Sequence, residues 1–98
     1  MDFLIENGFS NYFVNEIDNN LSDETKYLIS YNKDSVIDNI KYFRSIGITD
    51  KSIEELFYIN EELLIKDLDD VKKIFERYDI PKLVTILNND ISYIDNIF

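Results

Sequence analysis

The sequence predicts a small all-α protein in which seven to eight short helices form a bundle or a short right-angled stack. Apolar residues recur at helical spacing along the whole chain. Glycine and proline are scarce, with only Gly8, Gly47 and Pro81, whereas compact β folds use many such residues in turns. The chain has 98 residues, the size of one domain, so residues 1–98 are expected to share a single core.

The first third of the chain carries start and stop signals for three short helices. Gly8 is expected to end the first, because glycine adopts the left-handed conformation at little cost. Ser10 and Ser22 each precede an apolar stretch of helical spacing, where a serine hydroxyl can cap the first turn. Phe3, Leu4 and Ile5 open the first helix, and the residues expected to face the core in the next two are Phe13, Val14, Ile17, Leu21, Leu28 and Tyr31.

The middle of the chain carries the clearest helix, predicted over residues 35–46 with Asp34 as its cap and Gly47 as its stop. Ser52 and Glu55 predict a capping box at the start of the next helix, in which each side chain satisfies a free amide of the first turn. The residues expected to point inward are Val36, Ile40, Phe43, Ile53, Leu56 and Phe57.

The last third predicts a single turn over residues 60–64, a helix that begins at Asp67 or Asp69, and a helix with Pro81 in its first turn. An amphipathic segment follows from Asp90. Inward positions in this part are Leu68, Val71, Ile74, Phe75, Tyr78, Leu83, Val84 and Leu87. The centre of the core is expected where the best-defined apolar stripes meet, at Phe43, Ile53, Leu56, Val71 and Phe75.

Ile91, Ile94, Ile97 and Phe98 share one side of the C-terminal segment. This stripe either folds back to cover an apolar face of the same chain or docks on a second copy, since an exposed stripe pairs readily with itself across a two-fold axis. A monomer is the preferred interpretation, and a homodimer through these four residues is the alternative.

Composition and charge restrict the classes of function. The net charge is −10, which disfavours nucleic acid and anionic membranes through long-range repulsion and favours a basic protein partner. The chain has no cysteine, its N-terminus lacks the basic region of a signal peptide, and its longest apolar run is Leu56–Ile59, far short of the roughly twenty residues that span a membrane. The expected location is therefore the cytoplasm. The absence of alanine and the abundance of isoleucine, asparagine and aspartate indicate an AT-rich genome, such as that of a low-GC bacterium or its phage.

Two short stretches of the sequence each have a similar counterpart later in the chain. The surroundings of Gly8 match those of Gly47, 39 positions later, and Asp34-Ser35-Val36 matches Asp69-Asp70-Val71, 35 positions later. Both distances are in the range of helical repeats.

Residues 36–78 resemble the repeat of the mitochondrial transcription termination factor (mTERF) family. The helix stop reads Tyr42-Phe43-Arg44-Ser45-Ile46-Gly47-Ile48-Thr49, and the following turn reads Asn60-Glu61-Glu62-Leu63-Leu64-Ile65, with Asn60 where the family usually has proline. The resemblance implies about two and a half repeats in a curved stack of paired helices. It also implies binding of double-stranded nucleic acid through basic residues on the concave side. This chain lacks those basic residues, so the resemblance predicts the fold rather than the function.

The residue inventory predicts no catalytic, cofactor or metal site. Without histidine or cysteine there is no Ser-His-Asp arrangement, no cysteine nucleophile and no ordinary zinc site. Neither glycine belongs to a phosphate-binding motif. Paired acids such as Glu54-Glu55 and Glu61-Glu62 are better explained as residues at helix starts than as an acid–base pair.

Two surfaces remain as candidates for binding. A possible interaction surface comprises Tyr12, Tyr27, Tyr42, Tyr58, Glu61 and Glu62, because tyrosine is enriched at protein interfaces. Lys72, Lys73 and Arg77 form a possible basic patch, which is either a nucleic-acid contact or, with the neighbouring acids, a solvated helix face.

The sequence therefore predicts a small acidic protein-interaction module of the inhibitor, immunity or adaptor type, with no enzymatic activity. Its partner is expected to be a basic protein. The alternatives are a nucleic-acid-associated mTERF-like repeat protein, or an anionic nucleic-acid mimic that blocks a DNA-binding protein.

Overall fold

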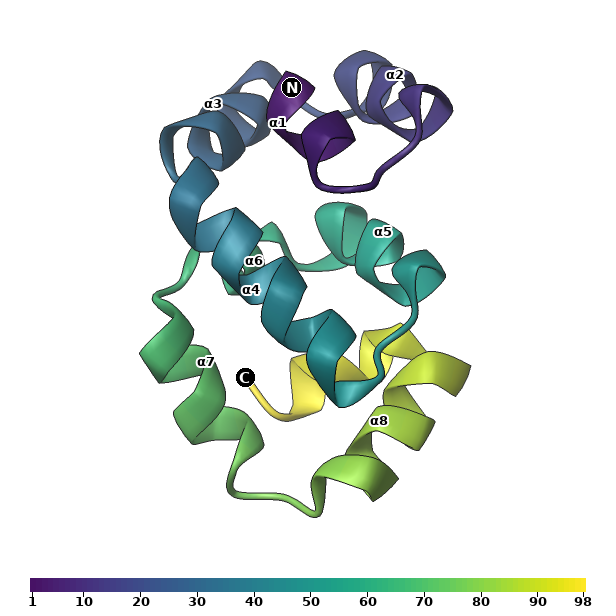
Figure 1. Ribbon diagram of the computed structural model, residues 1–98, viewed down its shortest axis with the longest axis vertical. Coiled ribbons are helices and arrows are strands. Elements are labelled where there is room, and N and C mark those ends of the chain that lie inside the picture. Colours follow the sequence, from purple (N-terminus) through teal and green to yellow (C-terminus); the bar gives the residue numbers. More distant parts are fainter.

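The computed structural model describes residues 1–98 and contains eight α-helices and one 3₁₀ helix, with no strand (Figure 1). Helix makes up 79% of the chain, so the predicted all-α class is confirmed. The elements are α1 (Asp2–Glu6), α2 (Asn11–Asn20), α3 (Asp23–Tyr31), α4 (Lys33–Ile46), α5 (Asp50–Ile59), α6 (Glu61–Ile65), α7 (Leu68–Phe75), α8 (Ile80–Asn89) and the 3₁₀ helix η1 (Ile91–Asn96).

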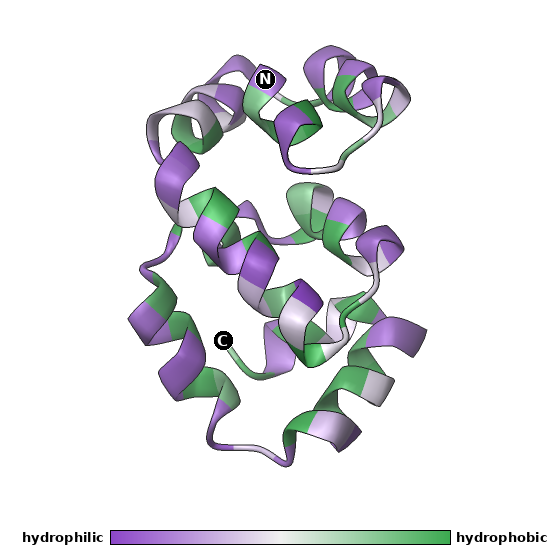
Figure 2. Ribbon diagram, viewed as in Figure 1, coloured by the Kyte–Doolittle hydropathy of each residue, from purple (hydrophilic) through white to green (hydrophobic).

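The longest helix, α4, runs through the middle of the molecule and contacts α3, α5, α6, α7 and α8. The three N-terminal helices lie at one end, and α7 and α8 lie at the other, with the C-terminal segment folded between them (Figure 1). Every long helix carries both apolar and polar residues (Figure 2). No helix is long and apolar enough to cross a bilayer.

The predicted centre of the core is confirmed. Phe43, Ile53, Leu56, Val71 and Phe75 are all fully buried, and the rings of Phe43 and Phe75 stack with their centroids 5.6 Å apart.

Two residues expected in the core are instead exposed. Tyr31 is 75% exposed and Tyr78 is 41% exposed, whereas Ile29 is the residue of α3 that is fully buried. Tyr31 ends a helix of only nine residues, in which a rotation of about one position changes which side chains face the core. Tyr78 lies beyond the end of α7 at Phe75, where the helical spacing no longer applies.

The predicted helix starts are right at some positions and wrong at others. The hydroxyls of Ser10 and Ser22 accept hydrogen bonds from the amides of Phe13 and Thr25, as expected for caps. The capping box at Ser52 is wrong, because Thr49 caps α5 by accepting from the amide of Ser52 at 3.3 Å. Thr49 lies directly before the helix, so Ser52 becomes part of the first turn and is buried.

The predicted cap at Asp34 is also wrong. Helix α4 begins at Lys33, two residues before the predicted start, and the side chain of its N-cap residue Asn32 makes no capping hydrogen bond. Asp34 lies inside the first turn, where its charge interacts favourably with the helix dipole. The sequence alone does not distinguish an N-cap from a first-turn residue here, because aspartate is common at both positions.

The two glycines end helices with the same turn. Gly8 and Gly47 have φ angles of 96° and 101°. The residue after each glycine donates its amide to the carbonyl five positions back, Phe9 to Leu4 and Ile48 to Phe43, both at 3.0 Å. This pattern is that of a Schellman turn. The following helices, α2 and α5, each have ten residues and start 39 positions apart, so this part of the chain has the same local structure twice.

Arg44 ties the two glycine turns together. Its Nη1 donates to the carbonyl of Asn7 at 2.6 Å and its Nε donates to Asp50 Oδ1 at 2.8 Å. Its guanidinium carbon lies 4.9 Å from the centroid of the Phe9 ring, within the range of a cation–π interaction. The guanidinium therefore holds the turn before α2 against the start of α5.

One buried polar side chain, Asn39 of α4, closes the end of α6. Its Nδ2 donates to the carbonyls of Leu64 and Lys66 at 2.9 and 2.7 Å, and lies 3.4 Å from the carbonyl of Leu63. The last carbonyls of a helix have no partner within that helix, and here one amide group supplies it.

Candidate protein-interaction groove

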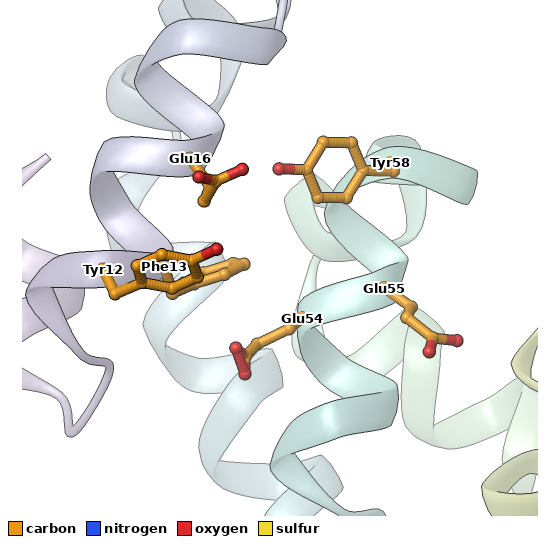
Figure 3. A pocket seen from close by; sticks show the side chains of 6 residues that line it. All are labelled: Tyr12, Phe13, Glu16, Glu54, Glu55 and Tyr58. Atoms are coloured by element: carbon orange, nitrogen blue, oxygen red, sulfur yellow. The ribbon is translucent and has the colours of Figure 1, made fainter.

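A groove of about 210 Å³ lies between α2 and α5. Its lining residues come from both helices and are Tyr12, Phe13, Glu16, Glu54, Glu55 and Tyr58. Tyr12 and Glu54 face each other across its lower part, and Glu16 and the Tyr58 hydroxyl face each other across its upper part (Figure 3). Glu55 points away from α2 (Figure 3).

Three phenylalanine rings hold the two walls of the groove together. The ring centroid of Phe13 lies 5.2 Å from that of Phe9 and 5.3 Å from that of Phe57. The Phe13 and Phe57 rings meet edge to face, at 71°, an arrangement that aromatic pairs prefer. Because Phe13 is buried and also lines the groove, the floor of the groove is the surface of the core.

The walls of the groove combine aromatic surface with negative charge. Tyr12 is 75% exposed and Tyr58 is 46% exposed, so the groove presents aromatic surface to solvent. Three of its six lining residues are glutamates and none is basic. None of the three glutamates forms an ion pair with a lysine or arginine of this chain, and the nearby Arg44 pairs with Asp50.

This environment affects the pKa of the Glu54 carboxyl. Its half-buried position raises the pKa of its carboxyl, and the negative charge of Asp50, one turn earlier on α5, raises it further. The residue that faces Glu54 from α2 is Tyr12 (Figure 3), which carries no positive charge. Burial and the charge of Asp50 both disfavour the ionised carboxylate, and Glu54 forms no ion pair within the chain.

We expect Glu54→Gln to leave the folded protein at least as stable as the original at neutral pH. Because the pKa of Glu54 is raised, the folded state holds its proton more tightly than the unfolded chain does, so the ionised carboxylate opposes folding. That opposition is absent below the ordinary glutamate pKa of about 4.3 and grows as pH rises through the raised value. Its size is small, because the carboxylate remains in contact with water.

Urea unfolding at acidic and at neutral pH measures this effect. The original protein and Glu54→Gln should have equal stability at acidic pH and differ only at neutral pH, with Glu55→Gln as the control on the same helix. A Glu54→Gln variant that is clearly less stable at neutral pH would show that the carboxylate has a partner after all.

The other residues of the predicted interaction surface lie elsewhere. Tyr27 is exposed on α3, and its ring stacks on that of Tyr31 with centroids 5.8 Å apart. Glu61 and Glu62 occupy the first turn of α6, a favourable position for acids at a helix start. The structure thus brings together only Tyr12 and Tyr58 of the six predicted residues.

Tyr42 packs against the core and does not lie with the exposed tyrosines. Its ring centroid is 6.2 Å from that of Phe43 and 6.0 Å from that of Phe75. Burial, and then the charge of Glu76, raises the pKa of its phenol. A half-buried tyrosine in this position supports the packing of α4 on α7.

The predicted basic patch is divided between two environments. Lys72 is half-buried, and its Nζ lies 5.6 Å from the centroid of the Tyr42 ring. Its charge therefore interacts with an aromatic ring of the same chain. Lys73 and Arg77 are exposed. Asp69 and Asp70 lie in the first turn of the same helix and Glu76 follows its end, so acids surround these bases.

A more open hollow of about 490 Å³ lies along α8, lined by Pro81, Lys82, Thr85 and Ile86, but all four residues belong to one helix and the hollow has no opposing wall. No three aspartates and glutamates come together in a way that could hold a metal ion.

Sequence reasoning placed Tyr12 and Tyr58 on an interaction surface but did not bring Glu16 and Glu54 to them. The sequence feature that relates α2 to α5 is the match between the surroundings of Gly8 and Gly47, 39 positions apart. In the structure the two helices have the same length and follow the same kind of turn. Comparison of the chain with models of protein families, with curated proteins and with solved structures finds no match.

Proposed function

We propose that this protein is a non-catalytic interaction module that binds a basic segment of a partner protein in the groove between α2 and α5. The observation that carries this proposal is the lining of the groove, which combines two exposed tyrosines and three glutamates with no basic residue. The net charge of −10 adds a long-range attraction that speeds the encounter with a basic partner.

The groove has the chemistry of a binding surface. Tyrosine supplies a large, rigid contact area at low conformational cost, and carboxylates at the edge of an apolar floor give direction and specificity. A cation beside Glu54 would also stabilise the ionised carboxylate, which burial and the charge of Asp50 disfavour in the free protein. An inhibitor, an immunity protein and an adaptor all act by binding of this kind.

A titration with a basic peptide tests the proposal. We expect a lysine- and arginine-rich peptide to bind, and Glu16→Gln with Glu54→Gln to weaken that binding about tenfold or more, because a desolvated charge pair contributes about 1.4 kcal/mol or more. Isothermal titration calorimetry and chemical-shift mapping by nuclear magnetic resonance (NMR) measure the affinity and the location.

The control removes the same amount of charge outside the groove. Glu24 of α3 and Asp38 of α4 are exposed and make no ion pair, so Glu24→Gln with Asp38→Asn should weaken binding only slightly. Equal losses in the two double variants would show that the overall charge, rather than the groove, attracts the peptide.

Nucleic-acid binding of the kind that the mTERF resemblance implies is the second candidate, supported by the repeated turn and helix of residues 8–20 and 47–59. The charge opposes it. We expect no measurable binding to duplex DNA at physiological salt, because repulsion acts before any contact forms. Binding with a steep salt dependence in a fluorescence titration would restore this candidate.

Competition between this protein and DNA for a DNA-binding protein would instead support the anionic-mimic version of the interaction module.

A further inference from the structure

We infer that the groove between α2 and α5 binds an arginine side chain of the partner, with the guanidinium group between the aromatic rings and the carboxylates of the two helices. This inference rests on the proposed function and specifies which cationic group the groove selects.

The molecule already binds one guanidinium in this way, next to the groove. Arg44 lies over the ring of Phe9, pairs with the carboxylate of Asp50 and donates to a backbone carbonyl. Phe9 packs directly on Phe13, which is the floor of the groove. The same aromatic cluster therefore contacts an arginine through Phe9 and lines the negatively charged groove through Phe13.

The groove repeats the components of the Arg44 site. Asp50 of the Arg44 pair and Glu54 of the groove are one turn apart on α5, and Tyr58 follows after a further turn. Phe13 and Tyr12 offer ring surface, and Glu16 offers a second carboxylate from the opposite wall (Figure 3). A ring with carboxylates on two sides matches a flat cation that stacks and donates in several directions at once.

These components favour arginine over lysine. The guanidinium is planar, has five donors in a fixed fork and stacks on aromatic faces, whereas the lysine ammonium is a compact and strongly hydrated charge. Carboxylates on opposite walls suit the fork, because its five N–H donors point in several directions within one plane. An ammonium would pair with one carboxylate and leave the ring surface of Tyr12 and Tyr58 largely unused.

The test compares three short peptides that differ only at one central residue: arginine, lysine or citrulline, the uncharged analogue of arginine. NMR titration of the full chain measures the affinity of each peptide. We expect arginine to bind about fivefold more tightly than lysine, the upper end of what a solvent-exposed cation–π contact supplies, and citrulline to show no measurable binding. The shifted resonances should be those of Tyr12, Glu16, Glu54 and Tyr58.

A pair of variants assigns the preference to the rings. Tyr12→Leu with Tyr58→Leu keeps both carboxylates and should reduce the ratio of arginine to lysine affinity to about one. Tyr27→Leu, at another highly exposed tyrosine, should leave the ratio unchanged.

The outcomes separate the two proposals. If arginine and lysine peptides bind equally and Glu16→Gln with Glu54→Gln weakens both, the groove binds basic segments but the arginine inference is wrong. If no charged peptide shifts the groove resonances, both the proposed function and this inference are wrong.

Discussion

Asn39→Asp should destabilise the protein by about 3–5 kcal/mol at neutral pH, the cost of leaving a buried charge without a partner. The side chain is fully buried, and its Nδ2 donates to the carbonyls of Leu64 and Lys66. A carboxylate of nearly the same shape has no hydrogen to donate and would place negative charge against these carbonyl oxygens. The loss is a large part of the usual stability of a domain, about 5–15 kcal/mol.

The effect should depend on pH in a defined direction. Burial and the neighbouring carbonyls raise the pKa of the introduced carboxyl in the folded state above the ordinary aspartate value of about 3.9. The folded state then holds the proton more tightly than the unfolded chain does. The stability of the variant is therefore greatest at acidic pH and falls as pH rises through the raised pKa.

Urea unfolding of three variants across this pH range separates charge from hydrogen bonding. Asn39→Ala removes the whole amide, and with it the donor, without adding a charge, so it should cost about 1–3 kcal/mol with little dependence on pH. Asn15→Asp makes the same chemical change on the exposed face of α2 and should cost little at any pH. If Asn39→Asp unfolds at the same urea concentration as the original protein, the amide of Asn39 does not hold the end of α6 in solution.

The features of this fold that the sequence predicts are those set by neighbouring residues. The caps at Ser10 and Ser22, the first-turn position of Pro81 and the left-handed turn at Gly47 each depend on the chemistry of one short segment. The sequence predicts these correctly because no distant contact is needed to choose them.

The features that it does not predict depend on residues far apart in the chain. Asn39 reads as an ordinary polar position of α4, and only the placement of α6 beside it supplies the carbonyls that it satisfies, 25 and 27 positions away. Arg44 acquires its role from Asn7, 37 positions earlier. A helical pattern specifies which side of a helix is apolar but does not say which helix end lies against a polar residue on it.

In the candidate groove, too, some features depend on neighbouring residues and others on contacts between distant parts of the chain. Tyr12 and Tyr58 are exposed, whereas Tyr42, which the sequence predicts to share their interaction surface, packs against Phe43 and Phe75. Glu54 reads as one of several acids near a helix start, and its role in the groove arises because Phe13 and Phe57 bring α2 against α5. The tertiary packing of the rings, rather than any local motif, builds the site.

The C-terminal segment carries the prediction with the largest expected effect: deletion of residues 91–98 should unfold the protein. Ile91, Ile94 and Ile97 are buried within the chain itself, in η1 and just after it, where the segment packs on α8 and α5. Phe98 adds a ring 6.0 Å from that of Phe75. Burial of each large apolar side chain contributes about 1.5–3 kcal/mol, so the whole segment contributes about as much as the entire stability of a small domain.

Circular dichroism and light scattering of the full chain and of a chain that ends at Asp90 measure this directly. We expect the full chain to be a folded monomer, because the apolar stripe that could pair with a second copy already covers α5 and α8. We expect the shortened chain to lose its helical signal or to aggregate through the face that it exposes. Two single variants make the test quantitative, since Ile94→Ala should cost about 2–5 kcal/mol as a buried large-to-small change and Asn96→Ala, on the exposed side of the same segment, should cost almost nothing. A full chain that is a dimer and becomes a folded monomer on truncation would contradict this closure within one chain, and would show that Ile91, Ile94 and Ile97 leave their buried positions to form a homodimer interface.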